Sequence, residues 1–158
     1  MVISANMKIG AWHIINDTVM GGESSSDLVA TKEGLLFHGQ LSLQNNGGFA
    51  SVRALVAEDL ANSTGIRLTV KGDGRDYQVR LRQDRNFDGA SWAYGFSTDG
   101  SIQVIEALYP DFEPVFRGRK LQDAGALEAA MIAQIGFLIA DRIESEFSLS
   151  ILDIQSIR

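Results

Sequence analysis

The chain of 158 residues contains no cysteine. That absence excludes disulfides, thiolate metal sites and cysteine nucleophiles, and it suits a reducing compartment. No segment approaches the ~18 consecutive apolar residues of a membrane-spanning helix. The N-terminal stretch MVISANMKIG has one lysine and no continuous apolar core, so it predicts neither a secretory signal nor a transit peptide. The expected location is therefore the cytoplasm, without a transmembrane segment.

Positive charge is scarce as well. Lysine and arginine number 14 against 20 acidic residues, which gives a net charge of −6 and a pI of about 4.8. Clustered positive charge is what binds phosphate backbones, so nucleic acid is not an expected partner. The length predicts one domain over residues 1–158. A domain of about 150 residues buries roughly 68–70% of its unfolded surface, so stability requires no disulfide or metal.

Residues suited to catalysis are few. His13 and His38 are the only histidines and fall in separate predicted strands, and the chain lacks HExxH, P-loop, GxGxxG and GxSxG motifs. Four aspartates flank the predicted hairpins: Asp73, Asp76, Asp84 and Asp88. Aspartates in such loops are more often turn formers than the paired acids of a glycosidase. A Ca²⁺ site built from Asp17, Asp84 or Asp88 is a weaker alternative. We expect a non-enzymatic protein with no catalytic residues, cofactor or metal.

Short alternating runs separated by Gly, Asp and Asn dominate the sequence. Ile66, Leu68 and Val70, for example, alternate with polar residues, as in a half-buried strand. Roughly ten such runs predict an all-β antiparallel sandwich or barrel. Hairpin turns are expected at three places: Lys32–Gly34, Gly72–Gly74 and Asp99–Gly100.

Several segments depart from simple alternation. Gly39 interrupts a strand, as a bulge or a close backbone approach requires. The apolar parity of the last strand reverses near Ile151, which predicts a bulge or strand end there. Leu108–Arg119 holds both prolines and predicts an extended, ordered loop. Leu121–Met131 is the one short helical segment expected, and Glu58–Ser63 suits a single helical turn.

Two glycine-paired turns at strand ends form the expected recognition surface, in WHIINDTVMGG (12–22) and NNGGFASVR (45–53). Adjacent glycines mark backbone with φ > 0 or backbone that another group approaches closely. The side chains beside them are turn formers and offer no reactive group. The residues expected to form the binding surface, here and in later arginine and aromatic segments, are Asn16, Asp17, Thr18, Met20, Gly21, Gly22, Asn46, Gly47, Gly48, Arg53, Arg80, Phe112, Phe116 and Arg117.

Two further groups of residues each admit two interpretations. A solvated strand face or an anion-binding patch could account for the arginines Arg80, Arg82, Arg85, Arg117 and Arg119. The ladder of Trp92, Tyr94 and Phe96 is more often core than a carbohydrate-stacking platform. Arg53 also suits a structural ion pair with Asp17.

The chain also resembles a known family. WHIINDTVMGGESS, FHGQLSLQNNGGFASVRA, GDGRDYQVRLR, FDGASWAYGF, YPDFEPVFRGR and QIGFLIADRIESEFSLSI, in this order, are similar to the complex I intermediate-associated protein 30 family, over about Trp12–Ile157. The resemblance implies a galactose-binding-domain-like jelly-roll β-sandwich. It also implies a non-enzymatic role, since the mitochondrial members, known as complex I assembly factor 1, chaperone respiratory complex I intermediates. Ser145-Glu146-Phe147 departs from the Gly-Pro-Phe that the family often has.

These observations favour a protein-binding or assembly-factor module, with respiratory-complex subunits as candidate partners. Met20, Phe112, Val115 and Phe116 would be its apolar anchors if exposed, with Arg117 as a hot spot. Alternatively, these side chains pack the loops onto the sandwich, an interpretation that suits Phe112 and Phe116 better than Met20. A small-ligand or carbohydrate-binding lectin-like module is the alternative function, although fold alone is a weak reason for it. A hydrolase is the least favoured.

Overall fold

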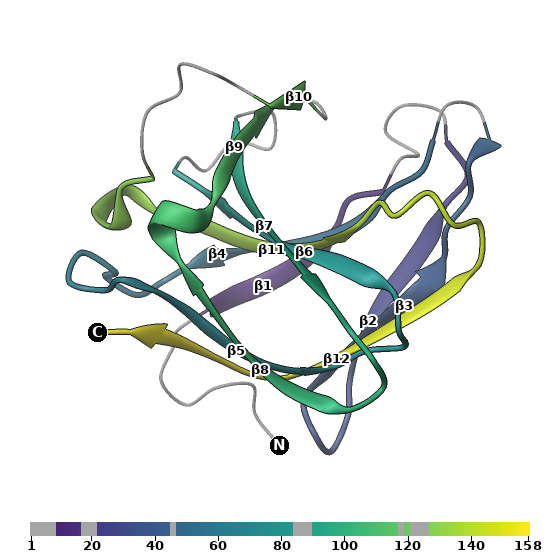
Figure 1. The fold of residues 1–158 in the computed structure, drawn as a ribbon, viewed down its shortest axis with the longest axis horizontal. Helices are drawn as coiled ribbons and strands as arrows, with labels where there is room; N and C mark the ends of the chain where they lie inside the picture. The colour runs from purple at the N-terminus through teal and green to yellow at the C-terminus, as the bar shows by residue number, and fades with distance from the viewer. Residues whose placement is uncertain (1–8, 17–21, 45–46, 84–89, 117–118, 121–126) are drawn as a thin grey trace.

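The computed structural model describes residues 9–16, 22–44, 47–83, 90–116, 119–120 and 127–158. They form two antiparallel sheets that face each other (Figure 1). The seven-stranded sheet has the order β1 (Ile9–Ile14), β4 (Ala50–Val56), β11 (Gln134–Ile139), β6 (Asp76–Arg82), β7 (Ser91–Ser97), β9 (Glu113–Phe116) and β10 (Arg119–Lys120). The five-stranded sheet has the order β2 (Ser25–Ala30), β3 (Leu35–Gln40), β12 (Glu146–Ile157), β5 (Gly65–Lys71) and β8 (Ile102–Leu108). The predicted all-β sandwich is confirmed.

The core lies between the inner faces of the two sheets. Alternation places every second side chain of a strand there, so that Val52, Leu68, Val79 and Phe137 have no exposed surface. The aromatic ladder of β7 also points inward, with Trp92 5% and Phe96 9% exposed. Its interpretation as core is therefore confirmed. No helix in the described ranges is long and apolar enough to cross a bilayer.

The turn predictions had mixed outcomes. The Lys32–Gly34 hairpin is confirmed, because β2 and β3 pair across it. The other two hairpins are wrong: β5 and β8 lie in one sheet, whereas β6 and β7 lie in the other. Gly72–Gly74 and Asp99–Gly100 therefore carry the chain from sheet to sheet. Gly and Asp favour reversal of the chain, but the apolar face of the next strand decides which sheet it joins.

The irregular segments were partly predicted. A Cβ on Gly39 would lie 2.0 Å from the Ser25 carbonyl oxygen, which confirms a close backbone approach. The register of β12 against β5 shifts between Ile151 and Asp153, as the parity reversal predicted. Leu108–Arg119 is not a plain loop, because Tyr109–Asp111 form the 3-10 turn η3 and β9 and β10 pair. A proline at the start of that turn suits its fixed backbone angle.

The two helical predictions were less successful. From Leu121–Met131, the structure describes only the last five residues, and Ala129–Met131 form the 3-10 turn η4. Glu58–Ser63 is an isolated turn without a helix, closed by a bond from the Ser63 N–H to the Leu60 carbonyl oxygen at 2.9 Å. Short apolar runs carry too little periodicity to distinguish a helical turn from a loop.

Candidate binding face of the seven-stranded sheet

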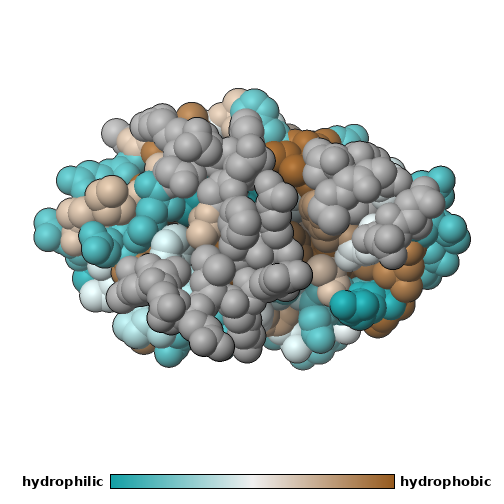
Figure 2. Space-filling view, turned by 90° about the horizontal axis from the view of Figure 1, so that it is seen from above, coloured by the Kyte–Doolittle hydropathy of each residue, from teal (hydrophilic) through white to brown (hydrophobic). Residues whose placement is uncertain are grey.

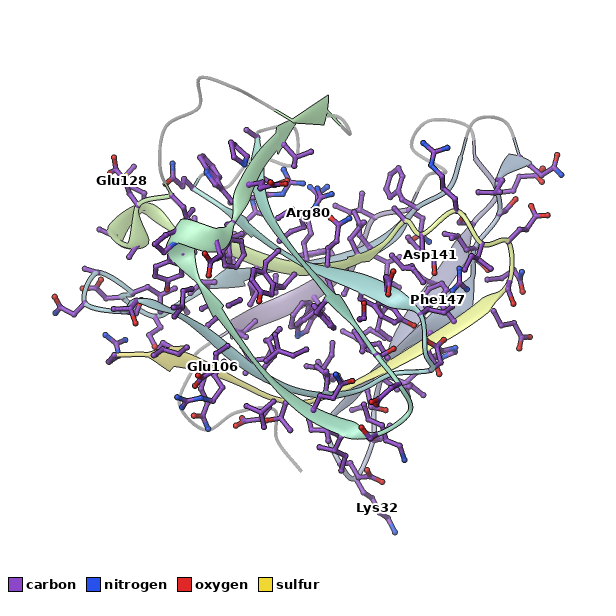
Figure 3. All side chains as sticks on the ribbon, viewed as in Figure 1. Lys32, Arg80, Glu106, Glu128, Asp141 and Phe147 are labelled. Atoms are coloured by element: carbon purple, nitrogen blue, oxygen red, sulfur yellow. The ribbon has the colours of Figure 1, made fainter. Side chains whose placement is uncertain are left out.

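Strand β6 turns a polar side toward the outside of the molecule. Tyr77, Val79 and Leu81 point into the core and are at most 1% exposed. The alternate residues of the strand consequently lie on the outer face of the seven-stranded sheet. Arg80 stands on that face in Figure 3, above the middle of the sheet. The outward residues change along the strand from acidic to neutral to basic: Asp76, Gln78, Arg80 and Arg82.

Strand register aligns Arg80 with residues of five neighbouring strands. It lies opposite Gly136 of β11 on one side and opposite Ala93 of β7 on the other. Beyond Gly136 the same level continues through Arg53 of β4 to His13 of β1. Beyond Ala93 it reaches Glu113 of β9. The outer row consists of His13, Arg53, Gly136, Arg80, Ala93 and Glu113.

The two residues beside Arg80 in the outer row have small side chains, because Gly136 has none and Ala93 has only a methyl group. A Cβ on Gly136 would meet the Val52 carbonyl oxygen at 2.6 Å, so the position requires glycine. The same Cβ would lie 3.3 Å from Cγ of Arg53, which places the stem of that arginine beside Gly136. Two arginines therefore flank Gly136, which is itself buried.

Arg80 is held by neutral groups. Its Nε–H donates to Oε1 of Gln78 at 2.8 Å, and an Nη1–H donates to Oγ of Ser91 at 3.0 Å. Ser91 is itself 2% exposed, so it fixes the guanidinium from below. Burial first, and then the positive charge of Arg82, lowers the pKa of Arg80 to about 10. The side chain is a desolvated cation.

An open pocket of about 410 Å³ continues this face toward the start of β6. Its lining includes Asp76, Gln78 and Gly95 of β6 and β7, and Asp141 after β11. Figure 2 views the molecule from this side, and its described part shows both hydrophilic and apolar surface. The lining of the pocket offers hydrogen-bonding groups and carboxylates to a ligand.

The described residues contain no group of three metal-ligating side chains. His13 lies on β1 and His38 on β3, in different sheets, so folding does not align the two histidines on one sheet. Asp17, Asp84 and Asp88, the weaker Ca²⁺ alternative, lie outside the described residues.

The first glycine-paired turn is anchored by Asn16. Its Oδ1 accepts bonds from Oγ of Ser26 at 2.8 Å and from the Ser51 N–H at 3.2 Å. Because Ser26 lies in β2 and Ser51 in β4, Asn16 links the two sheets, and it is 8% exposed. This position gives it a structural role in shaping the turn.

Other predicted binding residues are placed less completely. Gly48 has φ = 126°, as the prediction of left-handed backbone required. Gly22 is buried and Gly47 is half-buried. The following lie outside the described residues: Asp17, Thr18, Met20, Gly21, Asn46 and Arg117; Arg85 of the patch does too. Only the backbone of Phe116 and Arg119 is described.

Phe112 is not an exposed anchor. It is 6% exposed, and its ring lies 5.5 Å from that of Tyr94 and 6.4 Å from that of Tyr109, measured between centroids. The alternative, in which it packs the segment onto the sandwich, is the one observed. Arg82, at 8% exposed, also departs from a solvated strand face.

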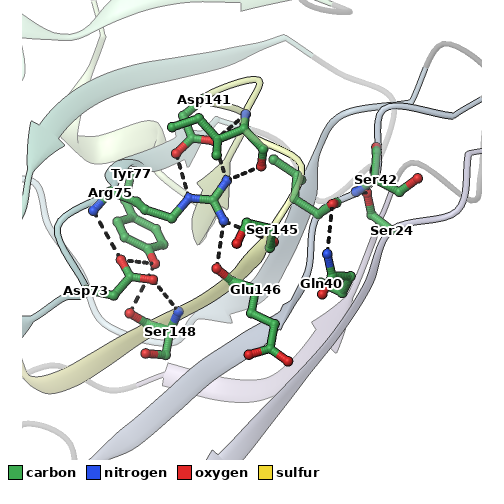
Figure 4. A network of polar contacts seen from close by, with 12 residues as sticks. Ser24, Gln40, Ser42, Asp73, Arg75, Tyr77, Asp141, Ser145, Glu146 and Ser148 are labelled. Carbon is green, nitrogen blue, oxygen red and sulfur yellow. Dashed lines mark hydrogen bonds and ion pairs between the residues drawn. The ribbon is translucent and has the colours of Figure 1, made fainter.

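A polar network around Arg75 fixes one end of the same face (Figure 4). Its Nε–H donates to Oδ2 of Asp141 at 2.8 Å, and its Nη1 donates to the carbonyl oxygens of Ser145 and Glu146 at 3.0 and 2.9 Å. An Nη2–H also donates to the carbonyl oxygen of Ile143. The arginine thereby ties the start of β6 to the loop between β11 and β12.

Asp73 completes this network from the preceding turn. Its Oδ1 accepts the hydroxyl of Tyr77 at 2.9 Å, and its Oδ2 accepts the Ser148 N–H at 2.8 Å. Burial first, and then the negative charge of Asp73, raises the pKa of Tyr77 well above its usual value. The phenol therefore stays protonated and acts as a donor that links the sheets.

Comparison with known proteins identifies the family. Residues 2–151 match the family model described as Complex I intermediate-associated protein 30 (CIA30). The chain belongs to the CIA30 family. It is similar to the mitochondrial Complex I intermediate-associated protein 30 of Mus musculus, with 26% identity over 163 residues that cover 89% of this chain and 50% of the relative. The CIA30-family chain thus spans about half the length of the curated relative.

Carbohydrate-binding modules are among the solved structures that resemble this CIA30-family chain. A family 11 module from Clostridium thermocellum, in complex with a β-1,3-1,4-mixed-linked tetrasaccharide, has a TM-score of 0.67 and 19% identity, covering 98% of this chain and 97% of the module. A family 11 module of a cellulosomal cellulase from the same organism has a TM-score of 0.68 and 19% identity, covering 98% and 96%. The likeness shows the fold, a galactose-binding-like jelly roll.

Sequence reasoning placed Arg53 and Arg80 in the candidate surface and missed the residues that shape it. Gln78 shares the parity of Arg80 along the CIA30-family motif GDGRDYQVRLR, which was a usable signal. Ser91 and Gly136 reach Arg80 only through pairing with strands β7 and β11, and the sequence has no local sign of that pairing.

Proposed function

We propose that this chain is a non-enzymatic protein-binding domain that assists the assembly of respiratory complex I. The observation that carries the proposal is the match to the CIA30 family over residues 2–151. The mouse relative is named for its association with complex I intermediates. Because the chain spans half of that relative, the role of the whole protein is transferred here as part of the proposal.

The outer face of the seven-stranded sheet supports a binding role. It presents the cationic Arg80 and hydrogen-bonding side chains such as Gln78. A protein partner can use both without any covalent bond being made or broken. The described residues contain no group of three His, Cys, Asp or Glu side chains that could hold a metal ion.

Affinity purification from the source cell, followed by mass spectrometry, tests the proposal. We expect the tagged chain to enrich subunits of NADH:ubiquinone oxidoreductase over a control that carries the tag alone. Deletion of the gene should lower NADH:ubiquinone reductase activity in membranes, and the intact gene should restore it. Recovery of no complex I subunit, together with unchanged activity after deletion, would refute the proposal.

Carbohydrate binding is the second candidate, because carbohydrate-binding modules are among the similar solved structures. One observation opposes it: the large hydrophobic side chains that are exposed in the described residues are all aliphatic or methionine. Saccharides usually stack on exposed aromatic rings, and Trp92 points into the core instead. Calorimetric titration with the mixed-linked tetrasaccharide distinguishes the two, since saturable heat at millimolar ligand would favour carbohydrate binding over protein binding.

A further inference from the structure

Strand β8 forms one edge of the five-stranded sheet, and no strand of the described part of the chain lies beyond it. In Figure 1 it runs across the near side of that sheet. Its register against β5 continues without a shift from Ile102 to Leu108. At the opposite edge of the sheet, β2 contacts β1 of the other sheet. The free edge of this sheet is therefore β8, and such an edge is a template for another strand.

Half of the backbone polar groups of β8 point away from β5. The Tyr109 N–H donates to the Thr64 carbonyl oxygen at 3.1 Å, and a Cβ on Gly65 would meet the Ala107 carbonyl oxygen at 2.5 Å. Both observations direct the groups of the odd-numbered residues toward β5. Hydrogen-bonding direction alternates along an antiparallel strand. The N–H and C=O groups of the even-numbered residues consequently point to the free edge: Ile102, Val104, Glu106 and Leu108.

The side chains of the same four residues lie on the outer face of the sheet. Ile102, Val104 and Leu108 are 61%, 62% and 42% exposed. The charge of Glu106 is compensated by Arg67 of β5, at 2.6 Å. Edge strands are usually protected by lysine, proline or a bulge, but β8 contains neither residue and pairs with β5 without a bulge. Its edge is thus regular and mostly apolar.

We propose that β8 pairs with β8 of a second copy of this chain, in an antiparallel two-fold dimer that joins the two five-stranded sheets. The register that gives every edge-facing group a partner places Ile105 on the two-fold axis. Ile102 then lies opposite Leu108 of the second copy, and Val104 lies opposite Glu106 of the second copy. All these residues direct their N–H and C=O groups across the contact, as in the hydrogen-bonded pairs of an antiparallel sheet. The contact is isologous, so it closes as a dimer.

Other two-fold registers fit the edge less well. With Val104 on the axis, Leu108 lies beyond the end of the second strand and its groups have no partner. With Glu106 on the axis, two carboxylates lie directly opposite each other, which is unfavourable. The register around Ile105 pairs the whole strand and sets Ile102 against an apolar residue at each end. A second copy suits this edge because its strand has the same length and the complementary pattern when reversed.

The dimer should be weak and should depend on salt. A contact limited to one strand pair is smaller than the ~1,200–2,000 Å² of a standard interface. Each copy has a net charge of −6, so long-range repulsion opposes association. Salt screens that repulsion, and we expect association to strengthen as salt is raised. Association that weakened with salt would contradict a contact made of backbone hydrogen bonds and apolar side chains.

Sedimentation velocity of the purified intact chain, over a series of concentrations, tests the dimer. We expect the wild type to change from monomer to dimer as concentration rises. Val104→Pro removes an N–H that faces the free edge, so it should keep the fold and weaken association by about tenfold or more, because the symmetric contact loses the bond twice. Ile143→Ser, which removes a 53% exposed isoleucine outside β8, should leave association unchanged. A wild type that stays monomeric, or a folded Val104→Pro that associates equally well, would overturn the proposal.

Single cysteines test the register, because the natural chain has none. In the proposed dimer, Ile105→Cys sets two thiols directly opposite each other, in a pair whose Cα atoms are about 4.5 Å apart and can be bridged by a disulfide. The thiols of Val104→Cys would be diagonal neighbours about 7–8 Å apart, although position 104 is the more exposed.

With oxidised glutathione as the oxidant, we expect Ile105→Cys to form the disulfide dimer faster than Val104→Cys. Faster cross-linking of Val104→Cys would indicate random collision and would refute the register, even if Val104→Pro failed to fold. Both experiments use the purified chain alone, so their outcome does not depend on whether the chain assists complex I assembly.

Discussion

Replacing Arg75 by alanine should destabilise the fold far more than replacing Arg67, although each arginine is paired with one carboxylate. The side chains of Arg75 and Asp141 are 10% and 8% exposed, whereas those of Arg67 and Glu106 are 40% and 54% exposed. Removing one member of a buried pair costs about 3–5 kcal/mol because the other charge is left uncompensated. An exposed pair contributes about 0–1 kcal/mol.

The geometry places the cost of Arg75→Ala near the lower end of that range. The variant leaves Asp141 without its partner and frees the carbonyl oxygens of Ser145 and Glu146. Those two residues are exposed, so water can replace part of what is lost. We expect a loss of about 3 kcal/mol in the free energy of unfolding. At about 2–4 °C per kcal/mol for a chain of this size, Tm should fall by roughly 6–12 °C.

The pH dependence gives an independent check. Burial opposes ionisation of Asp141, but hydrogen bonds from Arg75 and the Ile143 N–H outweigh it, so its pKa lies below the usual value of 3.8. A carboxyl whose pKa is lowered in the folded state stabilises the fold above the unfolded pKa of about 3.9, and this contribution is lost as the pH falls through the folded value. The gap in stability between wild type and Arg75→Ala should therefore be full at pH 7 and shrink below about pH 4.

Urea unfolding at pH 7 and at pH 3, with Arg67→Ala as the matched control, measures both effects. The reasoning fails if the two alanine variants lose similar stability at pH 7. It also fails if the deficit of Arg75→Ala is as large in acid as at neutral pH, because the loss would then arise from packing alone.

Three further variants test packing and surface. Gly39→Ala should destabilise the fold by about 1–3 kcal/mol, since its Cβ would lie 2.0 Å from the Ser25 carbonyl oxygen. The control Gly95→Ala, whose Cβ has its nearest neighbour at 4.0 Å, should be close to neutral when both variants are compared by thermal unfolding. Phe112→Ala should cost about 3–5 kcal/mol because the ring is buried against Tyr94 and Tyr109, and a loss under 1 kcal/mol would show that it is not core. Val104, 62% exposed on the edge strand β8, is an aggregation hazard, so Val104→Lys should reduce light scattering on heating and change stability by no more than about 0.5 kcal/mol.

Local pattern predicted which face of each strand is buried, but not which strands pair. The alternation in β5 and β6 identified Ile66, Leu68 and Val79 as inward residues, and all three are fully buried. The same logic predicted a hairpin at Gly72–Gly74, where the chain instead changes sheets. A hairpin and a crossing between sheets have the same turn residues and are flanked by the same alternating strands. Which of the two forms depends on how the apolar faces of all the strands pack into one core.

The candidate site divides along a similar line. Arg80 and its parity with Gln78 are readable in one strand, and so is its outward direction. Its contact with Ser91 comes from the neighbouring strand, 11 residues later. Asn16 was expected at the surface as a turn former, yet its amide oxygen is used by Ser26 and Ser51, from two different sheets. Burial of a polar residue depends on such distant partners, which a single sequence does not display.

Arg75 and Arg80 show why arginine alone does not mark a site. They are five residues apart in one family motif, but they differ in how far their charge and hydrogen-bond donors are paired. Arg75 meets a carboxylate and several carbonyl oxygens because the chain crosses there between sheets and brings the loop after β11 against it. Arg80 lies mid-strand, where register supplies only Gly136 and Ala93 at its sides, and its contacts are neutral. An arginine that the fold pairs with a carboxylate ties two parts of the chain together, whereas a buried arginine with neutral partners leaves part of its desolvation cost uncompensated.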